Sequence, residues 1–341
     1  MGSRTVLGAM VTFMFERQRR RLENVSRPLV FATVIGACCG PLIVRAQQTQ
    51  EAHLEVVQVR PNFYMIAGAG GNIGVQIGDD GIVLVNSGSA AMSDQVSAAI
   101  RNLSSTGVTY IVNSSDDADE IGGNATIPQA VNPRGWAEPV IVATQSVLNR
   151  MVAAQLPSKS LPTDTLYLQE EKPLYLNGEG IEVLAEHSAH TDGDVMVFFR
   201  RSDVLVAGDV LDTTRFPVLD LKRGGSIQGE IDALNRIITT AIPSIPFVFQ
   251  PGGTYVLPGH GYICERDDVV HYRNMITIIR DVVQDMIKRG MSLEQVKAAN
   301  PTKGYRTRYG SDSGSWTTDM FVEAVYTSLK RNPPDTASAE R

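Results

Sequence analysis

The sequence predicts an α/β fold, in which strands and helices alternate along the chain. Residues 54–85 are rich in β-branched side chains and are interrupted by glycines, which is typical of consecutive short strands. Residues 89–103 then place apolar side chains at helical spacing, and a further apolar run follows at Val108–Val112. A strand, a helix and a strand that ends in a polar loop form the unit from which α/β domains are built.

The first half of the predicted domain continues this alternation. Residues 79–81, Asp-Asp-Gly, indicate a hairpin turn between two strands. The helix at 89–103 is amphipathic, with an apolar face made of Met92, Val96, Ile100 and Leu103. Beyond the strand at 108–112, the pattern predicts a strand at 139–143 and a helix at 145–155.

The second half repeats this plan of strands followed by helices, without a residue-level repeat. Alternating strands are expected between residues 161 and 190, before a hairpin of strands at 195–199 and 204–207. The remaining predicted elements are a helix at 227–240, a strand at 255–257 and helices at 267–289 and 318–329. The domain is thus expected to span 47–330, and the polar tail at 331–341 is predicted to be disordered.

Residues 1–46 have the pattern of an export signal. Basic residues at 17–21 precede an apolar stretch at 28–44, which is followed by Val44-Arg45-Ala46. An uncleaved membrane anchor is one alternative, although roughly 17 apolar residues interrupted by two glycines and a proline are short for a spanning helix. Lipid attachment at Cys38 is another. We therefore expect a periplasmic or secreted protein with no membrane contact beyond this segment.

The charge of the remaining chain limits the classes of partner. Removal of residues 1–46 would leave 24 basic and 35 acidic residues, a formal net charge of −11. A strongly negative surface argues against nucleic acid or an anionic membrane as the main partner, so a small-molecule substrate is expected. Only Cys264 would remain of the three cysteines, which excludes an intramolecular disulfide after cleavage. The oligomeric state is left open.

Acidic and histidine side chains follow several predicted strands. The loop after Val108–Val112 carries Asp117, Asp119 and Glu120, and later apolar runs end near Asp209 and His260. We expect all five side chains to lie on loops at strand ends, where rigid strands direct polar groups toward one point. Carboxylate oxygens and imidazole nitrogens are metal ligands, so the pattern predicts a metal site.

The order of these fragments resembles the metallo-β-lactamase superfamily over about residues 54–290. The resemblance rests on GGN at 122–124, HTDGD at 190–194, GD at 208–209 and GHG at 259–261. It implies a four-layer αββα sandwich that holds one or two metal ions at the edge where the two sheets meet. It also implies that His190 is a ligand of the first metal, that Asp209 bridges both metals and that His260 binds the second.

The first motif departs from the family pattern His-x-His-x-Asp-His. Ser115 and Asp117 stand at the first two histidine positions, Asp119 is retained, and Glu120 replaces the last histidine. Asn86 stands where the family usually has an aspartate below the site. Carboxylates still coordinate divalent metals, whereas the hydroxyl of Ser115 is a poor ligand while protonated.

The resemblance therefore implies two carboxylate-rich ligand sets. The first would contain Asp117, His190 and Asp209, and the second Asp119, Glu120, Asp209 and His260. Zinc is the usual metal of the family, and the added carboxylates shift the preference toward iron or manganese. Ser115, Asn86 and His187 are expected beside the ligands, and His187 could replace a lost ligand if its loop rearranged.

These residues imply a metal-dependent hydrolase. A metal-activated water would attack an ester, lactone, amide or thioester, with Asp119 orienting it and passing a proton to the leaving group. One alternative is a catalytically silent binding protein that kept the fold after its metal site decayed, and another is an oxidoreductase that uses two irons. Cys264 either lies close to the site or is a packed structural thiol.

Overall fold

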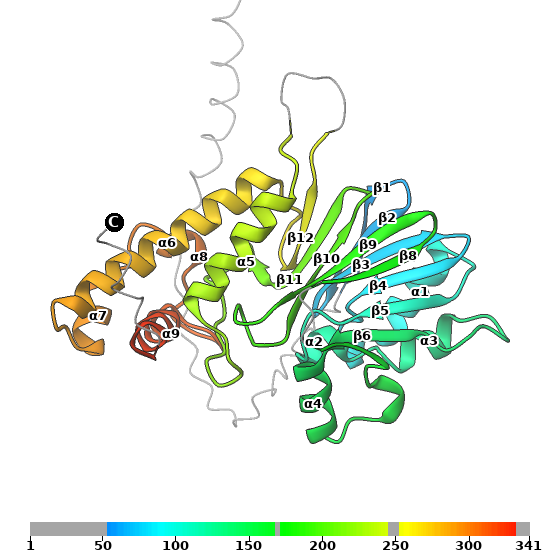
Figure 1. The fold of residues 1–341 in the computed structure, drawn as a ribbon, viewed down its shortest axis with the longest axis horizontal. Coiled ribbons are helices and arrows are strands. Elements are labelled where there is room, and N and C mark those ends of the chain that lie inside the picture. The colour runs from blue at the N-terminus through cyan, green and yellow to red at the C-terminus, as the bar shows by residue number, and fades with distance from the viewer. Residues whose placement is uncertain (1–52, 168–170, 245–251, 332–341) are drawn as a thin grey trace, which may run out of the picture. The chain divides into compact units, whose positions relative to one another are not determined.

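The computed structural model describes residues 53–167, 171–244 and 252–331 (Figure 1). The predicted export signal at 1–46 and all but the first residue of the predicted disordered tail at 331–341 lie outside these ranges. Both therefore stay predictions. Within the described ranges, every helix is too short or too polar to cross a membrane.

The first sheet is formed by the N-terminal half of the described chain. Its seven strands lie side by side in chain order: β1 (Glu55–Arg60), β2 (Phe63–Ala69), β3 (Gly71–Gly78), β4 (Gly81–Val85), β5 (Val108–Val112), β6 (Val140–Thr144) and β7 (Asp164–Leu166). Strands β1 to β4 pair antiparallel, and the turn between β3 and β4 is the predicted hairpin. From β4 onward the strands are parallel, so their carboxyl ends meet at one edge.

The second sheet contains five strands from the later part of the described chain. In spatial order they are β12 (Tyr255–His260), β11 (Val204–Asp212), β10 (Asp194–Phe199), β9 (Glu179–Glu186) and β8 (Glu171–Leu176). Strands β11 and β12 are parallel and place Asp212 opposite His260, whereas the other pairs are antiparallel. The carboxyl ends of β11 and β12 therefore share one edge of this sheet.

The helices confirm the longer sequence predictions. The described α-helices are α1 (Ser93–Leu103), α2 (Ala118–Ile121), α3 (Thr126–Val131), α4 (Gln145–Ala153), α5 (Ile227–Thr240), α6 (Arg266–Lys288), α7 (Leu293–Ala299), α8 (Arg306–Tyr309) and α9 (Thr318–Arg331), and 3₁₀ turns lie at Ala90–Met92 and Ser158–Ser160. Helices α1, α4, α5, α6 and α9 were expected. The sequence missed α2, α3, α7 and α8, because one or two turns are too short to show helical periodicity.

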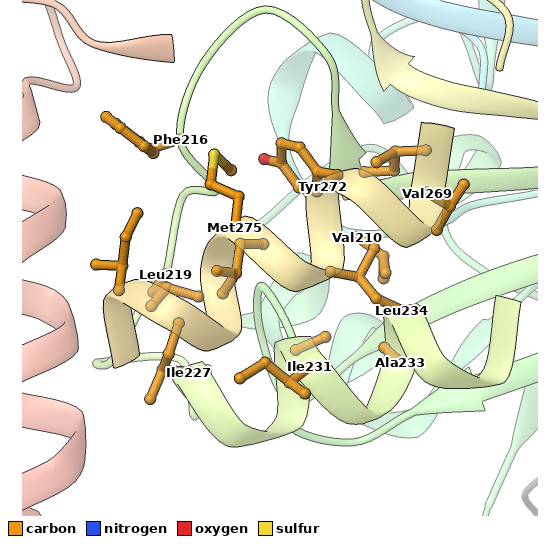
Figure 2. Packing of buried hydrophobic residues seen from close by; sticks show 14 of the residues in the cluster. Val210, Phe216, Leu219, Ile227, Ile231, Ala233, Leu234, Val269, Tyr272 and Met275 are labelled. Atoms are coloured by element: carbon orange, nitrogen blue, oxygen red, sulfur yellow. The ribbon is translucent and has the colours of Figure 1, made fainter. Parts of the chain in front are cut away.

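Three hydrophobic clusters divide the domain into four layers. Along β11, Val204 and Val206 point into a cluster between the two sheets, while Leu205 and Ala207 point to the opposite face. That opposite face packs against α5, α6 and α9. Figure 2 shows part of this cluster, with labelled side chains from β11, the loop after it, α5 and α6. The outer face of the first sheet packs against α1 and α3. The order helix, sheet, sheet, helix is the predicted αββα sandwich (Figure 1).

Candidate metal centre

The acidic segment after β5 starts a helix instead of remaining a loop. Asp117 is the N-cap residue of α2, and Asp119 and Glu120 lie in its first turn. The prediction that Asp119 and Glu120 lie on a loop is therefore wrong, because carboxylates near a helix N-terminus favour a helical turn. Neighbouring helical positions point in different directions, so Asp119 is 40% exposed while Glu120 is completely buried.

Asp209 lies inside β11 instead of on the loop after it. The pairing of β11 with β12 is irregular around Gly208, which has a φ of 54°, and the strand continues to Asp212. Such an irregularity redirects a side chain without ending the strand, which the sequence could not show. His260 is the last residue of β12, so it lies within the strand's end, and His190 lies on the loop between β9 and β10.

The structure brings these side chains together in two groups that share Asp209. The first ligand group is Asp117, His190 and Asp209, and the second ligand group is Glu120, Asp209 and His260. Within each group the candidate ligand atoms lie within 4.8 Å of one another. Asp119 belongs to neither group, but its Oδ2 lies 3.5 Å from Nε2 of His260.

A cavity of about 290 Å³ opens onto both groups. It is lined by Asp117, Asp119, His190, Asp209, Asp212, Arg215, Val218, His260, Ser315 and Trp316. Arg215, Ser315 and Trp316 were not predicted to lie there, because they come from segments without a recognisable motif. The cavity is large enough for a small molecule and carries both charged and aromatic walls.

Glu120 is the most unusual side chain of the site. Its carboxylate is fully buried, and although the Asn86 amide lies nearby, neither oxygen has a partner at hydrogen-bond geometry among the described residues. Burial raises the pKa of Glu120 well above its ordinary value, and the nearby charges of Asp209, Asp119 and Asp117 raise it further, while the Asn86 amide counters this in part. The ionised form of Glu120 is therefore unfavourable at this position, and a nearby positive charge would stabilise it.

Ser115 contacts two candidate ligands, and Asn86 contacts the backbone beside them. Ser115 donates its hydroxyl to Oδ2 of Asp209 at 3.0 Å and accepts a bond from the Asp117 backbone amide at 3.2 Å. Asn86 accepts a bond from the Ser114 amide at 2.8 Å, and its own φ of 68° places it in the left-handed region. Burial also raises the pKa of Asp209, although the charge of His190 opposes this.

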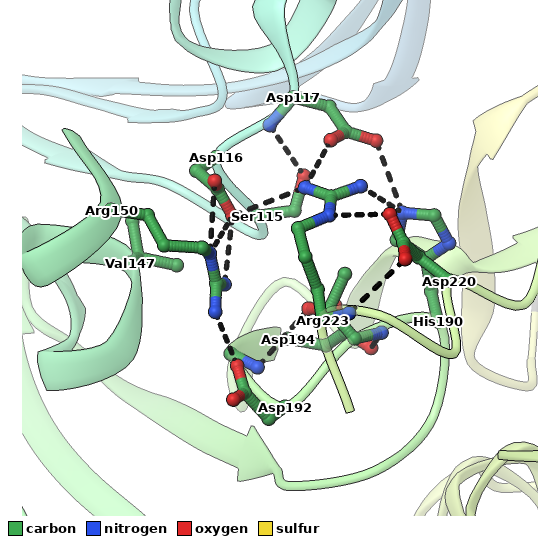
Figure 3. Close-up of polar contacts among 12 residues, drawn as sticks. Ser115, Asp116, Asp117, Val147, Arg150, His190, Asp192, Asp194, Asp220 and Arg223 are labelled. Carbon is green, nitrogen blue, oxygen red and sulfur yellow. Dashed lines mark hydrogen bonds and ion pairs between the residues drawn. The ribbon is translucent and has the colours of Figure 1, made fainter. Parts of the chain in front are cut away.

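The first ligand group already has a cationic partner. Arg223 donates from Nη1 to Asp117 at 2.5 Å and from Nε to Asp220 at 2.8 Å (Figure 3). His190 donates from Nδ1 to the Val218 carbonyl at 2.8 Å, and its Nε2 lies 3.0 Å from Asp117. Burial alone would lower the pKa of His190, but the Asp117 bond and the neighbouring carboxylates raise it to about 10. His190 and Arg223 in turn hold the pKa of Asp117 well below its ordinary value despite burial.

A second arginine fixes the two loops that form this side of the site. Arg150 on α4 donates to both oxygens of Asp116, at 2.8 to 3.0 Å, and also contacts Asp192 (Figure 3). It therefore joins the segment before α2 to the loop that carries His190. Sequence reasoning missed Arg150 and Arg223, because no local pattern shows which distant carboxylate an arginine will meet.

His187 does not join the site. It is exposed and lines a different surface pocket, together with Thr144 and Asp192. The chain bends at residues 187–190 after β9, and His190 is buried whereas His187 is exposed, so a spacing of three residues does not bring the two imidazoles together.

Cys264 is a packed thiol, and we expect it to react slowly. It is 2% exposed, pairs with Val256 in an isolated bridge and belongs to the core below α6. Burial raises the pKa of the thiol to about 12, so only about one molecule in ten thousand would carry a thiolate at pH 8. Alkylation by iodoacetamide, followed on the Cys264 peptide by mass spectrometry, should be at least about a thousand-fold slower than in guanidinium, and equal rates would contradict this assignment.

Comparison with known sequences places most of this domain in one family. The profile of a family described as the metallo-beta-lactamase superfamily matches residues 67–265, which run from the end of β2 through β12 and include every residue of both ligand groups. A search of curated proteins found no match.

Comparison with solved structures finds the same fold at low sequence identity. A metallo-β-lactamase from Pontibacter korlensis is 15% identical, with a TM-score of 0.50 over 66% of this chain and 99% of that one. The DIM-1 metallo-β-lactamase is 17% identical, with a TM-score of 0.50, and the match covers 66% of this chain and 97% of that one. The inverting sec-alkylsulfatase Pisa1 from Pseudomonas sp. is 12% identical, with a TM-score of 0.58 over 80% of this chain and half of that one.

Proposed function

The chain belongs to the metallo-β-lactamase superfamily, and from this premise we propose that it is a metal-dependent hydrolase of a small-molecule substrate. The observation that carries the proposal is the buried carboxylate of Glu120, which has no hydrogen-bond partner among the described residues and lies beside Asp209 and His260. What sets Glu120 apart from other buried carboxylates is that one of its oxygens lies within 4.8 Å of candidate ligand atoms of Asp209 and His260.

The second ligand group fits a divalent cation. An isolated charge in a protein interior costs several kcal/mol, about the penalty that a cation between Glu120, Asp209 and His260 would offset. Two carboxylates and one imidazole suit zinc, iron or manganese, and Asp119 lies close enough to His260 to act as a further donor. When bound, such a cation supplies Lewis acidity, which lowers the pKa of a neighbouring water toward about 7.

The residues around the cavity give the rest of the proposed reaction. Asp119 is partly exposed to the cavity, so its Oδ2 would accept the proton of the attacking water and return it to the leaving group. Val218 and Trp316 form the less polar wall and would limit the access of bulk water. The substrate would be an ester, lactone, amide or thioester. The signal-like pattern of residues 1–46 supports action outside the cytoplasm.

A binding protein without catalysis is the second candidate. The contact of Arg223 with Asp117 favours it, because an arginine already neutralises part of the first ligand group. On this alternative, the cavity would bind its small molecule without any cation.

Metal content and metal-dependent turnover separate the two candidates. The purified full chain would be incubated with Mn²⁺, Fe²⁺ or Zn²⁺ and desalted, and bound metal would be counted by mass spectrometry. Hydrolysis of an ester, lactone, amide and thioester panel would then be measured before and after chelation and after metal is restored.

We expect near-stoichiometric metal, turnover that chelation removes and restoration recovers, and loss of both in Asp209→Asn. Asp232→Asn, which changes an exposed carboxylate on α5, is the matched control and should keep both. A chain that takes up none of the three metals and hydrolyses nothing would overturn the hydrolase proposal in favour of the binding protein. Electron transfer from a coupled pair of irons, without hydrolysis, would overturn it in favour of an oxidoreductase.

A further inference from the structure

The two ligand groups differ in how many of their candidate ligand atoms already form hydrogen bonds or ion pairs with other side chains. In the first group, Oδ1 of Asp117 accepts from Arg223 at 2.5 Å and Oδ2 lies 3.0 Å from His190 Nε2. Nη2 of Arg223 also lies 3.4 Å from His190 Nε2 (Figure 3). Both oxygens of one ligand and the inward nitrogen of another are therefore engaged by groups of the chain itself.

The second ligand group shows the opposite condition. Neither oxygen of Glu120 has a partner within the described ranges. His260 Nε2 lies 3.6 Å from Asp209 and 3.5 Å from Asp119, which is too long for a hydrogen bond. The oxygens of Glu120 and Nε2 of His260 are therefore not engaged by hydrogen bonds to the other candidate ligands within the described ranges.

Arg223 is held in place by its own loop. Its Nε donates to Asp220 at 2.8 Å, and its backbone carbonyl accepts from the Asp192 amide at 2.8 Å. The Asp220 amide donates to the His190 carbonyl at 2.9 Å, so the arginine turn and the His190 loop are joined directly. The guanidinium is therefore part of the site's framework, and only 23% of the side chain is exposed.

A guanidinium has a permanent positive charge and no lone pair for a metal, so it competes with a cation for the same carboxylates. We propose that Arg223 takes the place of the first metal, so that the centre binds a single divalent ion, at Glu120, Asp209 and His260. This inference rests on the proposed metal dependence and adds the number of ions and the residue that sets it.

Counting bound ions tests the inference independently of turnover. Wild-type chain and Arg223→Met would be titrated with Mn²⁺ by calorimetry, and metal per chain would be counted after desalting. We expect one ion in the wild type and two in Arg223→Met, with spin coupling between two Mn²⁺ ions visible by paramagnetic resonance only in the variant.

Arg215→Met is the matched control, since Arg215 lines the same cavity but pairs with Asp212 and touches neither ligand group in the contacts of the described chain. It should keep one ion. Two ions in the wild type would overturn the role of Arg223 and leave the hydrolase proposal standing, and this measurement does not depend on the variant folding. One ion in both wild type and a folded Arg223→Met would also overturn it. No ion in the wild type would overturn the proposed metal dependence itself.

Discussion

Replacement of Glu120 by glutamine is expected to weaken cation binding by at least about 100-fold while it stabilises the metal-free protein. Loss of a residue beside metal ligands typically costs about 10–100-fold in affinity, so loss of a ligand charge should cost more. In the metal-free protein the same carboxyl group is buried without a hydrogen bond to any described residue and must keep its proton, whereas glutamine is neutral at every pH and has nearly the same volume. Function and stability should therefore move in opposite directions.

The stabilisation should grow with pH. Because the pKa of Glu120 is raised in the folded chain, the folded state binds more protons than the unfolded state at every pH between about 4.5 and that raised value. The contribution of Glu120 to stability is thus fully present below pH 4.5 and is lost as the pH rises. Glutamine does not titrate. The difference in free energy of unfolding between the variant and the wild type should therefore grow, in favour of the variant, by up to about 1.4 kcal/mol per pH unit.

The measurement is urea denaturation in the presence of a chelator at pH 5, 6, 7 and 8, together with calorimetric metal titration. Glu230→Gln is a matched control, because Glu230 on α5 is also fully buried and both its oxygens also have no hydrogen-bond partner in the described structure, yet it belongs to neither ligand group. It should show the same pH trend and keep metal affinity. Unchanged affinity in Glu120→Gln would rule out Glu120 as a ligand.

The sequence predicted the architecture well because periodicity is a local property. The alternation along β11 and the apolar face of α1 depend only on neighbouring residues, and the structure confirms both. The ordered fragments around His190, Asp209 and His260 then sufficed to predict the family and its four layers. The prediction that Asp209 lies on a loop was wrong, because the irregular pairing at Gly208 that keeps it within β11 depends on a partner strand elsewhere in the chain.

The electrostatic partners of the site were beyond sequence reasoning. Ser115 could be placed beside the ligands from the altered motif alone. Arg223, in contrast, contacts Asp117 across a sequence separation of 106 residues, and Arg150 contacts Asp116 across a separation of 34 residues. The two glycines after Arg223 were the available signal, because adjacent glycines in a loop often indicate that its backbone packs closely against another segment. They do not show which segment that is.

The close approach at Gly225 leads to a further prediction: Gly225→Ala should destabilise the protein at or above the upper end of about 1–3 kcal/mol. A β-carbon on Gly225 would lie 2.1 Å from the His190 carbonyl oxygen and 2.9 Å from that of Ala189. Both are backbone atoms, so no side-chain rotation can relieve the overlap. The φ of Gly225 lies outside the left-handed region, hence the cost arises from lack of space and not from backbone conformation.

Gly304→Ala provides the comparison, because a β-carbon at Gly304 would meet no atom of the described structure within 4 Å and its φ is also outside the left-handed region. We expect it to be neutral or to stabilise by about 0.4–1 kcal/mol through a less flexible unfolded chain. Urea denaturation of both variants measures the difference. Similar free energies of unfolding for the two variants would show that the loop at Gly225 can shift at little cost to accommodate a β-carbon.

A large cost at Gly225 alone would show that the loop of His190 and the turn of Arg223 are packed as one rigid unit. Such rigidity is what the single-ion centre requires, since the guanidinium excludes a cation only while it stays against Asp117 and His190. A folded Gly225→Ala chain should accordingly bind a second Mn²⁺ more readily than the wild type, because displaced backbone at His190 would loosen the contacts of Arg223.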